Sequence, residues 1–356
     1  MSVDKNLEKD GLIVLEQIDT ETIINITNSI AQKIVKTFPN FGLDEQEIFG
    51  KLFSLKMYKA DIPQGTLDAS YCYKNSSIYF NYKIENEDLE EFAIHECLHY
   101  LQEIKDSKNN LLKLGLADYT GFKPVGNGIN EAAVQYIASK IIGVKPDFEK
   151  YFDLNLFTPS PSYYPVECAL LNEIVFFIGD DILFKSTFFS SDEFKDEVIN
   201  YTSKKTYKKI VKAFDSILKL EENIISLTNK DLNTNENSNI QETIEQYRTN
   251  IRDSFINTQN LIIKEFFESI FNSISNLEEL EDCRRKLSKF ESIIGATEDY
   301  NFFKEYSSEL MNKLEHKTSI LENGGAETAL STSTFSVFNI FSKIKSLLHS
   351  KKSLEK

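Results

Sequence analysis

The sequence has few cysteines, no long apolar run and too little positive charge for a nucleic-acid-binding surface. Lys and Arg total 40 against 55 Asp and Glu, a net charge of −15. This charge excludes a general nucleic-acid coat, because phosphate binding needs a positive surface. No apolar run approaches the roughly 20 residues of a membrane span. The cysteines lie far apart with no paired spacing, which excludes a disulfide scaffold and a cysteine-rich zinc module and fits a reducing compartment: Cys72, Cys97, Cys168 and Cys283.

The first 19 residues also lack the features of a signal peptide. Acidic residues stand on both sides of a short GLIVL segment, whereas a signal peptide has a basic start and a longer apolar core. We therefore expect a cytoplasmic protein, and export of an effector without a signal peptide is an alternative that the residues do not address. With 356 residues, 41% of them hydrophobic, the chain is long enough for two ordinary domains or one large one.

Proline and glycine are concentrated in the first half of the chain. All seven prolines precede position 166, and ten of the thirteen glycines precede position 180. Because both residues interrupt helices, the first half should be turn-rich and mixed, and the second half nearly all helix. The sequence therefore predicts an α+β fold with a boundary near residue 200 and a mostly α-helical C-terminal region.

Hydrophobic periodicity predicts the elements of the first half. Strands are expected within 11–19 and 56–63, and a hairpin within 69–82 around a KNSS turn. Helices are expected at 21–37 with Thr20 as N-cap, at 44–54, 87–104, 130–141, 165–178 and 192–202.

The second half shows three amphipathic stripes. They run through 207–227, 244–277 and 300–314, and an Asn-rich stretch at 229–239 separates the first two. The long stripe mixes large aromatics with isoleucine and does not keep strict heptads, so an intramolecular hairpin or bundle over 201–321 is favoured over a dimeric coiled coil. The sequence does not specify an oligomeric state.

The end of the chain reads as a separate piece. Residues 322–335 are rich in Gly, Ser and Thr and predict a flexible linker, and 336–356 predict a basic amphipathic helix. Through 336–352 this helix would contact an anionic membrane or a partner groove. The alternative is that it docks on the acidic surface of the same protein.

The strongest chemical signal is the HExxH motif His95-Glu96-Cys97-Leu98-His99, which falls within the predicted helix 87–104. Residues four apart share one helical face, so both imidazoles can bind one Zn²⁺ while Glu96 lies beside them. The alternative is a structural histidine pair on a helix. We expect a zinc site with His95 and His99 as ligands.

A catalytic zinc site needs a third protein ligand and an open position for water. His316 and His349 lie in the helical half and the tail, so a carboxylate is expected. Our choice is Glu131, which follows two glycines and begins a predicted helix, with Asn130 as a possible cap. The rival carboxylates are Asp118, Glu167 and Glu173.

Together, HECLH and INEAAVQYIASK resemble the gluzincin branch of HExxH zinc metallopeptidases. They are also similar to poorly characterised bacterial proteins that pair an HExxH helix with a G-x-(L/I)-N-E segment. The resemblance covers about residues 70–200. It implies a zincin-like metallopeptidase domain over 1–200, with a small twisted sheet whose edge strand lines the cleft, expected here at 77–82. It also implies His95, His99 and Glu131 as ligands and Glu96 as general base.

The sequence departs from that family pattern at one position and leaves another role open. Many such sites place an acidic residue four after the ligand glutamate, and here that residue is Gln135, which accepts a hydrogen bond but brings no charge. For the group that steadies the oxyanion, Tyr119 is our choice, with Tyr163 and Tyr164 as rivals.

We expect a zinc-dependent peptide hydrolase that acts on a peptide or protein substrate. The substrate backbone would pair with the 77–82 strand, and the helical half would restrict access, select substrates or mediate assembly. The alternative is a scaffold or binding protein built on a catalytically inactive zincin-like core. The intact Glu96 argues against it, since a binding module has no need of the base.

Overall fold

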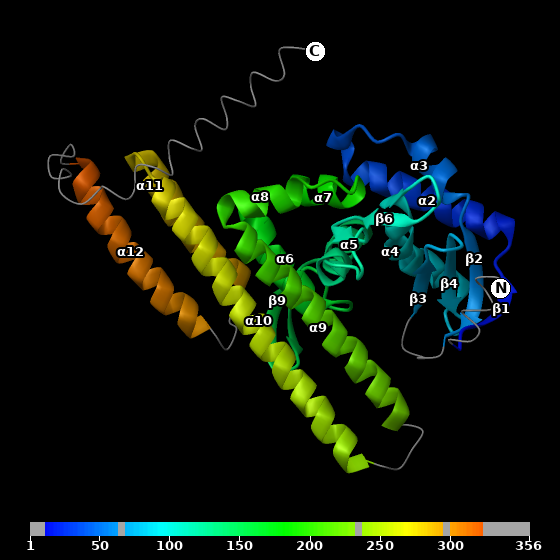
Figure 1. The fold of residues 1–356 in the computed structure, drawn as a ribbon. Helices are drawn as coiled ribbons and strands as arrows, with labels where there is room; N and C mark the ends of the chain where they lie inside the picture. Colours follow the sequence, from blue (N-terminus) through cyan, green and yellow to red (C-terminus); the bar gives the residue numbers. More distant parts are fainter. Residues whose placement is uncertain (1–10, 63–67, 232–236, 295–299, 323–356) are drawn as a thin grey trace.

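The computed structural model describes residues 11–62, 68–231, 237–294 and 300–322. The fold is α+β, with three small sheets in the first half and a helical C-terminal region, as predicted. In Figure 1 the largest sheet lies at one side of the molecule, helices α11 and α12 lie at the opposite side, and α5 lies between them. Among the described residues, no helix combines the length and apolarity needed to cross a membrane.

The largest sheet has four strands in the order β1-β2-β4-β3. The strands are β1 (Ile13–Gln17), β2 (Lys56–Asp61), β3 (Ala69–Cys72) and β4 (Ser77–Asn81). β2 and β4 run parallel, whereas β1 pairs with β2, and β3 with β4, in the antiparallel direction. The predicted hairpin around the KNSS turn is thus confirmed.

The prediction that 77–82 forms the edge strand is wrong. β4 is hydrogen-bonded on both sides, to β2 and to β3, and all five of its residues are buried. The turn after Cys72 folds the chain back, so that the short strand β3 covers one side of β4 and becomes the edge of the sheet. A substrate that adds a strand on this side must therefore pair with β3.

Three helices pack around this sheet in the first hundred residues. They are α2 (Thr20–Thr37), α3 (Glu45–Leu52) and α4 (Leu89–Leu101), and a 3-10 turn, η1 (Pro39–Phe41), follows α2. The N-cap of α2 is Asp19 rather than Thr20, because the carboxylate of Asp19 accepts the backbone N–H of Thr22 at 2.9 Å. α4 contacts β3, β4 and α2, and a further 3-10 turn, η2 (Asn86–Asp88), precedes it.

α4 ends earlier than its apolar pattern predicts. The helix stops at Leu101, and Glu103–Lys105 forms β5, which pairs with β6 (Leu111–Leu114), while β7 (Ala117–Asp118) continues that sheet. Helix α5 (Asn127–Ile142) follows. Its N-cap is Gly126, at φ 90°, and Asn130 is a buried residue inside the helix rather than the cap, since its Oδ1 accepts the N–H of Leu116.

The chain then forms a hairpin and three further helices. The hairpin comprises β8 (Asp147–Tyr151) and β9 (Leu154–Thr158), and the helices are α6 (Pro165–Ile178), α7 (Asp180–Phe188) and α8 (Glu193–Tyr201). The helices predicted at 165–178 and 192–202 are confirmed, and the hairpin and α7 were not predicted. The C-terminal helices are α9 (Lys204–Asp231), α10 (Asn237–Ser273), α11 (Leu277–Ile294) and α12 (Tyr300–Glu322).

The C-terminal helices pack within one chain, as the irregular stripe predicts. α9 packs along α10, α11 along α12, and α6 contacts both α10 and α11. A single apolar cluster extends from Ile129 on α5 and Ile174 on α6 to Phe266 on α10 and Leu314 on α12. This core therefore runs across residue 200. The linker was predicted at 322–335, and α12 includes its first residue, Glu322. The rest of this linker and the predicted basic helix 336–356 lie outside the described residues.

Candidate metal centre

Two helices bring three of the predicted site residues together. His95 and His99 lie one turn apart on α4, and Glu131 lies on α5, which packs against it. The two Nε2 atoms are 3.0 Å apart, and Oε2 of Glu131 is 3.2 Å from that of His95 and 3.4 Å from that of His99. Among the described residues these three form a group that can hold a metal ion.

The rival carboxylates lie elsewhere in the described structure. Asp118 is exposed and accepts hydrogen bonds from Thr120. Glu173 is buried in the helical core, where Gln259 donates to it at 2.6 Å. Glu167 is buried beside Glu221 of α9. The geometry therefore assembles Glu131 with the histidines and none of its rivals.

The electrostatics of the three groups are tightly linked. Burial by itself lowers the pKa of His95, but the hydrogen bond to Glu131 and the charges of Glu96 and Glu131 outweigh it and raise this pKa to about 9. Burial of Glu131 favours its neutral form, yet the charge of His99 and its contacts with both histidines hold its pKa well below the usual range. Glu131 is therefore an anion next to two imidazoles, and this charge is suited to a metal cation.

Gln135 fixes the orientation of His95. Its Oε1 lies 2.9 Å from Nδ1 of His95, and its Nε2 donates to the hydroxyls of Ser139 at 3.2 Å and Ser160 at 3.0 Å. The hydroxyl of Ser160 donates in turn to the carbonyl of Tyr163. Because the amide nitrogen is engaged, the amide oxygen must face His95. The Nδ1 of His95 therefore carries a proton that it donates to Gln135, and Nε2 is the ring nitrogen that faces Glu131 and His99.

Glu96 is half-buried and lies beside the group without joining it. Burial raises its pKa, and the charges of His95 and His99 and a hydrogen bond from the backbone of Tyr71 oppose that rise. Tyr71 belongs to β3, so the edge strand of the sheet contacts this carboxylate directly. A carboxyl group of raised pKa next to a possible metal site has the properties of a general base.

Of the three candidate tyrosines, Tyr164 contacts His95. Its ring stacks on His95 with centroids 5.9 Å apart and an interplanar angle of 24°. Tyr163 instead donates its hydroxyl to Asp68 at 2.7 Å. Tyr119 packs edge-on against Tyr73 at 6.2 Å, and burial followed by the charge of Glu131 raises its pKa to about 12.

A cavity of about 380 Å³ opens beside the group, and His95, Glu96 and Tyr164 form part of its wall. Among the described residues, Asp68 and Ala69, at the start of β3, form another part, whereas Tyr119 does not line it. The cavity therefore extends from the free edge of the sheet to His95 and Glu96. This arrangement can place an extended chain next to a bound metal ion and a base.

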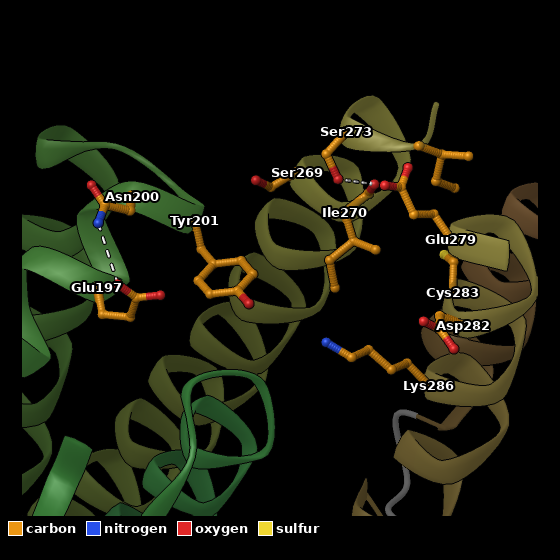
Figure 2. Close-up of a pocket in the computed structure, with 11 residues that line it drawn as sticks. Glu197, Asn200, Tyr201, Ser269, Ile270, Ser273, Glu279, Asp282, Cys283 and Lys286 are labelled. Atoms are coloured by element: carbon orange, nitrogen blue, oxygen red, sulfur yellow. Dashed lines mark hydrogen bonds between the residues drawn. The ribbon is translucent and has the colours of Figure 1, made fainter. Parts of the chain in front are cut away.

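A second hollow of similar volume, about 380 Å³, lies between α8, α10 and α11, far along the helical region. Figure 2 shows Tyr201 of α8 and Lys286 of α11 projecting into it, with Cys283 of α11 beside them. The buried thiol and the charged rim residues form no group that can hold a metal among the described residues.

Comparison with known proteins does not assign the chain to a family. No protein-family model matches it, and neither a curated protein nor a solved structure matches it. The site itself is therefore the basis for assigning a function.

Proposed function

We propose that this protein is a zinc-dependent peptide hydrolase with a zincin-like catalytic region. The observation that carries the proposal is the convergence of His95, His99 and Glu131 next to the half-buried carboxylate of Glu96. Two imidazoles and one carboxylate form the ligand set of a catalytic zinc site, which keeps its fourth position open.

The spacing of the ligand atoms is compatible with a zinc ion. Zn²⁺ binds histidine nitrogen and carboxylate oxygen at about 2.0–2.2 Å, so that ligand atoms at tetrahedral angles lie about 3.3 Å from one another. The three separations here are 3.0, 3.2 and 3.4 Å. The atoms thus stand close to where a tetrahedral ion would hold them.

Each protein group then has a role in hydrolysis. Zinc in this site would supply a Lewis acid that acidifies water and polarises a carbonyl group. Glu96 takes a proton from the attacking water and passes it to the leaving amine, and the burial that raises its pKa favours this exchange. The substrate backbone pairs with the free edge of β3, next to the wall formed by Asp68 and Ala69.

For the oxyanion we now favour Tyr164 over Tyr119. Tyr164 stacks on His95 and lines the cavity, and burial together with the surrounding carboxylates holds the pKa of its hydroxyl well above 10. The hydroxyl is therefore a neutral donor at any working pH. Tyr164→Phe should lower kcat more than Tyr119→Phe does. The reverse order would favour Tyr119 as the oxyanion donor.

The test of the proposed function is a pair of matched variants. Zinc content and peptide cleavage are measured for the wild type, for Glu96→Gln, and for Glu85→Gln, an exposed glutamate just before α4. We expect about one zinc per chain in all three. Cleavage should fall about 10²–10⁴-fold in Glu96→Gln alone, because only the general base is lost.

Two results would overturn the proposal. A Glu96→Gln variant that keeps wild-type turnover would remove the base from the mechanism. A zinc-loaded wild type that cleaves no peptide of a broad library would favour the alternative of an inactive zincin-like scaffold.

A further inference from the structure

The cavity that reaches His95 and Glu96 is also lined by a buried carboxyl group from the helical region. Glu221 of α9 forms part of its wall and has only 7% of its surface exposed. Glu167, in the first turn of α6, is fully buried, and its carboxyl group contacts that of Glu221.

In the part of the chain that the structure describes, this carboxyl pair forms no ion pair with a lysine or arginine. Among the described residues, no donor serves either oxygen of Glu167 or Oε1 of Glu221. Burial and mutual repulsion raise the pKa of Glu221 well above its usual range, and burial raises that of Glu167 to about 7. When the two groups share one proton, the pair carries a single negative charge, and burial favours uptake of a second proton unless a cation reaches the pair. A buried charge is costly unless a cation or several donors reach it.

Part of the cavity wall is apolar. The side chains of Ile142, Val144, Ile224 and Ile225 line the same cavity. Such a wall suits a chain of methylene groups, and the carboxyl group suits a cation at the end of that chain. Lysine and arginine have this build, with an apolar stem and a charged head.

We propose that this cavity binds a lysine or arginine side chain of the peptide substrate, with the cationic head on Glu221 and the stem along the isoleucines. The inference rests on the proposed peptidase function, since it assigns the substrate class of the same site. Glu167 supports this site because its carboxyl group hydrogen-bonds that of Glu221, so that the two groups share the charge that would face the cation. A free N-terminal ammonium group is the competing cation, but it has no methylene stem for the apolar wall.

The first arm of the experiment measures binding and does not need catalysis. The zinc-loaded full chain is titrated with acetyl-lysine methylamide and with acetyl-norleucine methylamide, which keeps the stem and lacks the charge. We expect the lysine probe to bind about 10–100-fold more tightly, as for a hydrogen bond to a charged group. This preference should disappear in Glu221→Gln and persist in Glu222→Gln, the exposed neighbour whose carboxylate pairs with Lys219.

The second arm measures kcat/KM on N-acetylated peptides that differ only by lysine, arginine or norleucine at each position. We expect basic side chains to be favoured about 10–100-fold at one position, and this preference to be lost in Glu221→Gln. Acetylation removes the N-terminal cation, so cleavage that requires a free N-terminus whatever the side chain would overturn the inference.

The two arms separate failure of the inference from failure of the proposed function. Equal binding of both probes to the wild type overturns the inference, even where peptides are cleaved and even where Glu221→Gln does not fold. Preferential binding of the lysine probe without cleavage of any peptide supports the cation site and removes the peptidase function.

Discussion

Gln135 offers the sharpest test of how the metal centre is built. Its amide is the only polar group that links His95 to the serine hydroxyls behind α5 in the described structure. Gln135→Ala would leave the three ligands in place and remove the acceptor at 2.9 Å from Nδ1 of His95. The ring would then lose the contact that fixes its tautomer and its direction.

The expected magnitude follows from the role of such contacts. Loss of a hydrogen-bond partner behind a ligand histidine typically lowers metal affinity about 10–100-fold, or about 1.4–2.7 kcal/mol. The loss of zinc affinity should be smaller than the loss caused by removing a ligand, because Nε2 of His95 still faces Glu131 and His99. Gln135→Glu keeps an acceptor toward His95 and makes the ring a more basic ligand, so it should recover the affinity.

The assay is competition for zinc against a chromogenic chelator, with the unfolding free energy measured in parallel on metal-free protein. Gln246→Ala, an exposed glutamine on α10, is the matched control. A zinc Kd of Gln135→Ala within about twofold of wild type would refute the reasoning, because the predicted loss begins at about tenfold. So would a loss in Gln135→Ala that Gln135→Glu does not recover.

Three predictions concern the supporting structure. Burial raises the pKa of Glu173 to about 8 in the folded protein, whereas the pKa of an unfolded glutamate is about 4.3. Between these two pH values the folded protein keeps the carboxyl proton that the unfolded chain has lost. The unfolding free energy therefore falls as pH rises through this range, by up to about 1.4 kcal/mol per pH unit. Glu173→Gln should flatten this loss in urea unfolding at pH 5.5 and 7.5, and an unchanged slope would contradict it. The carboxylate of Asp215 accepts hydrogen bonds from the N–H groups of Gly126 and Gly128 at 2.9 Å each. Asp215→Ala should lower the unfolding free energy, measured by urea unfolding, by about 0.5–2 kcal/mol, as for a lost helix cap. An unchanged unfolding free energy would show that water replaces the cap. A Cβ at Gly128 would overlap the carbonyl oxygen of Phe214. Gly128→Ala should therefore lower the unfolding free energy by about 1–3 kcal/mol and weaken zinc binding in the chelator assay. A wild-type unfolding free energy and a wild-type zinc affinity would argue against close packing of α5 on α9.

Local sequence patterns were sufficient to predict the features that depend on a single segment of the chain. The HExxH spacing placed both histidines on one face of α4, and proline at its first residue with glycine just after its last marks α6. Glu131 was found because a turn with glycine stands directly before its helix. Gly126 does make that turn, at φ 90°.

Other features depend on pairings that no local pattern reports. The hairpin β8–β9 turns through Phe152 and Asp153, at φ 48° and 61°, without the Gly or Asn that normally marks such a turn. The edge position of β3 follows from the parallel pairing of β2 with β4. Alternation of apolar residues predicts a strand but does not predict which strand it pairs with. Tyr164 is favoured as the oxyanion donor because its ring packs on His95, a contact that its neighbours in sequence do not predict.

The ligand helix depends on the helical region as much as on the sheet. Asp215 of α9 caps the first turn of α5, one turn before Glu131, and Gly128 lets the two backbones approach closely. Since Glu131 is carried by a helix whose start is held by α9, we expect a shift of α9 to change the distance from Oε2 to the two imidazoles. Because α9 also carries Glu221 into the cavity, one helix both positions the proposed metal ligand Glu131 and forms the proposed specificity wall. In physical terms, the metal centre and the C-terminal helices are therefore parts of one structural unit, although the sequence changes character near residue 200.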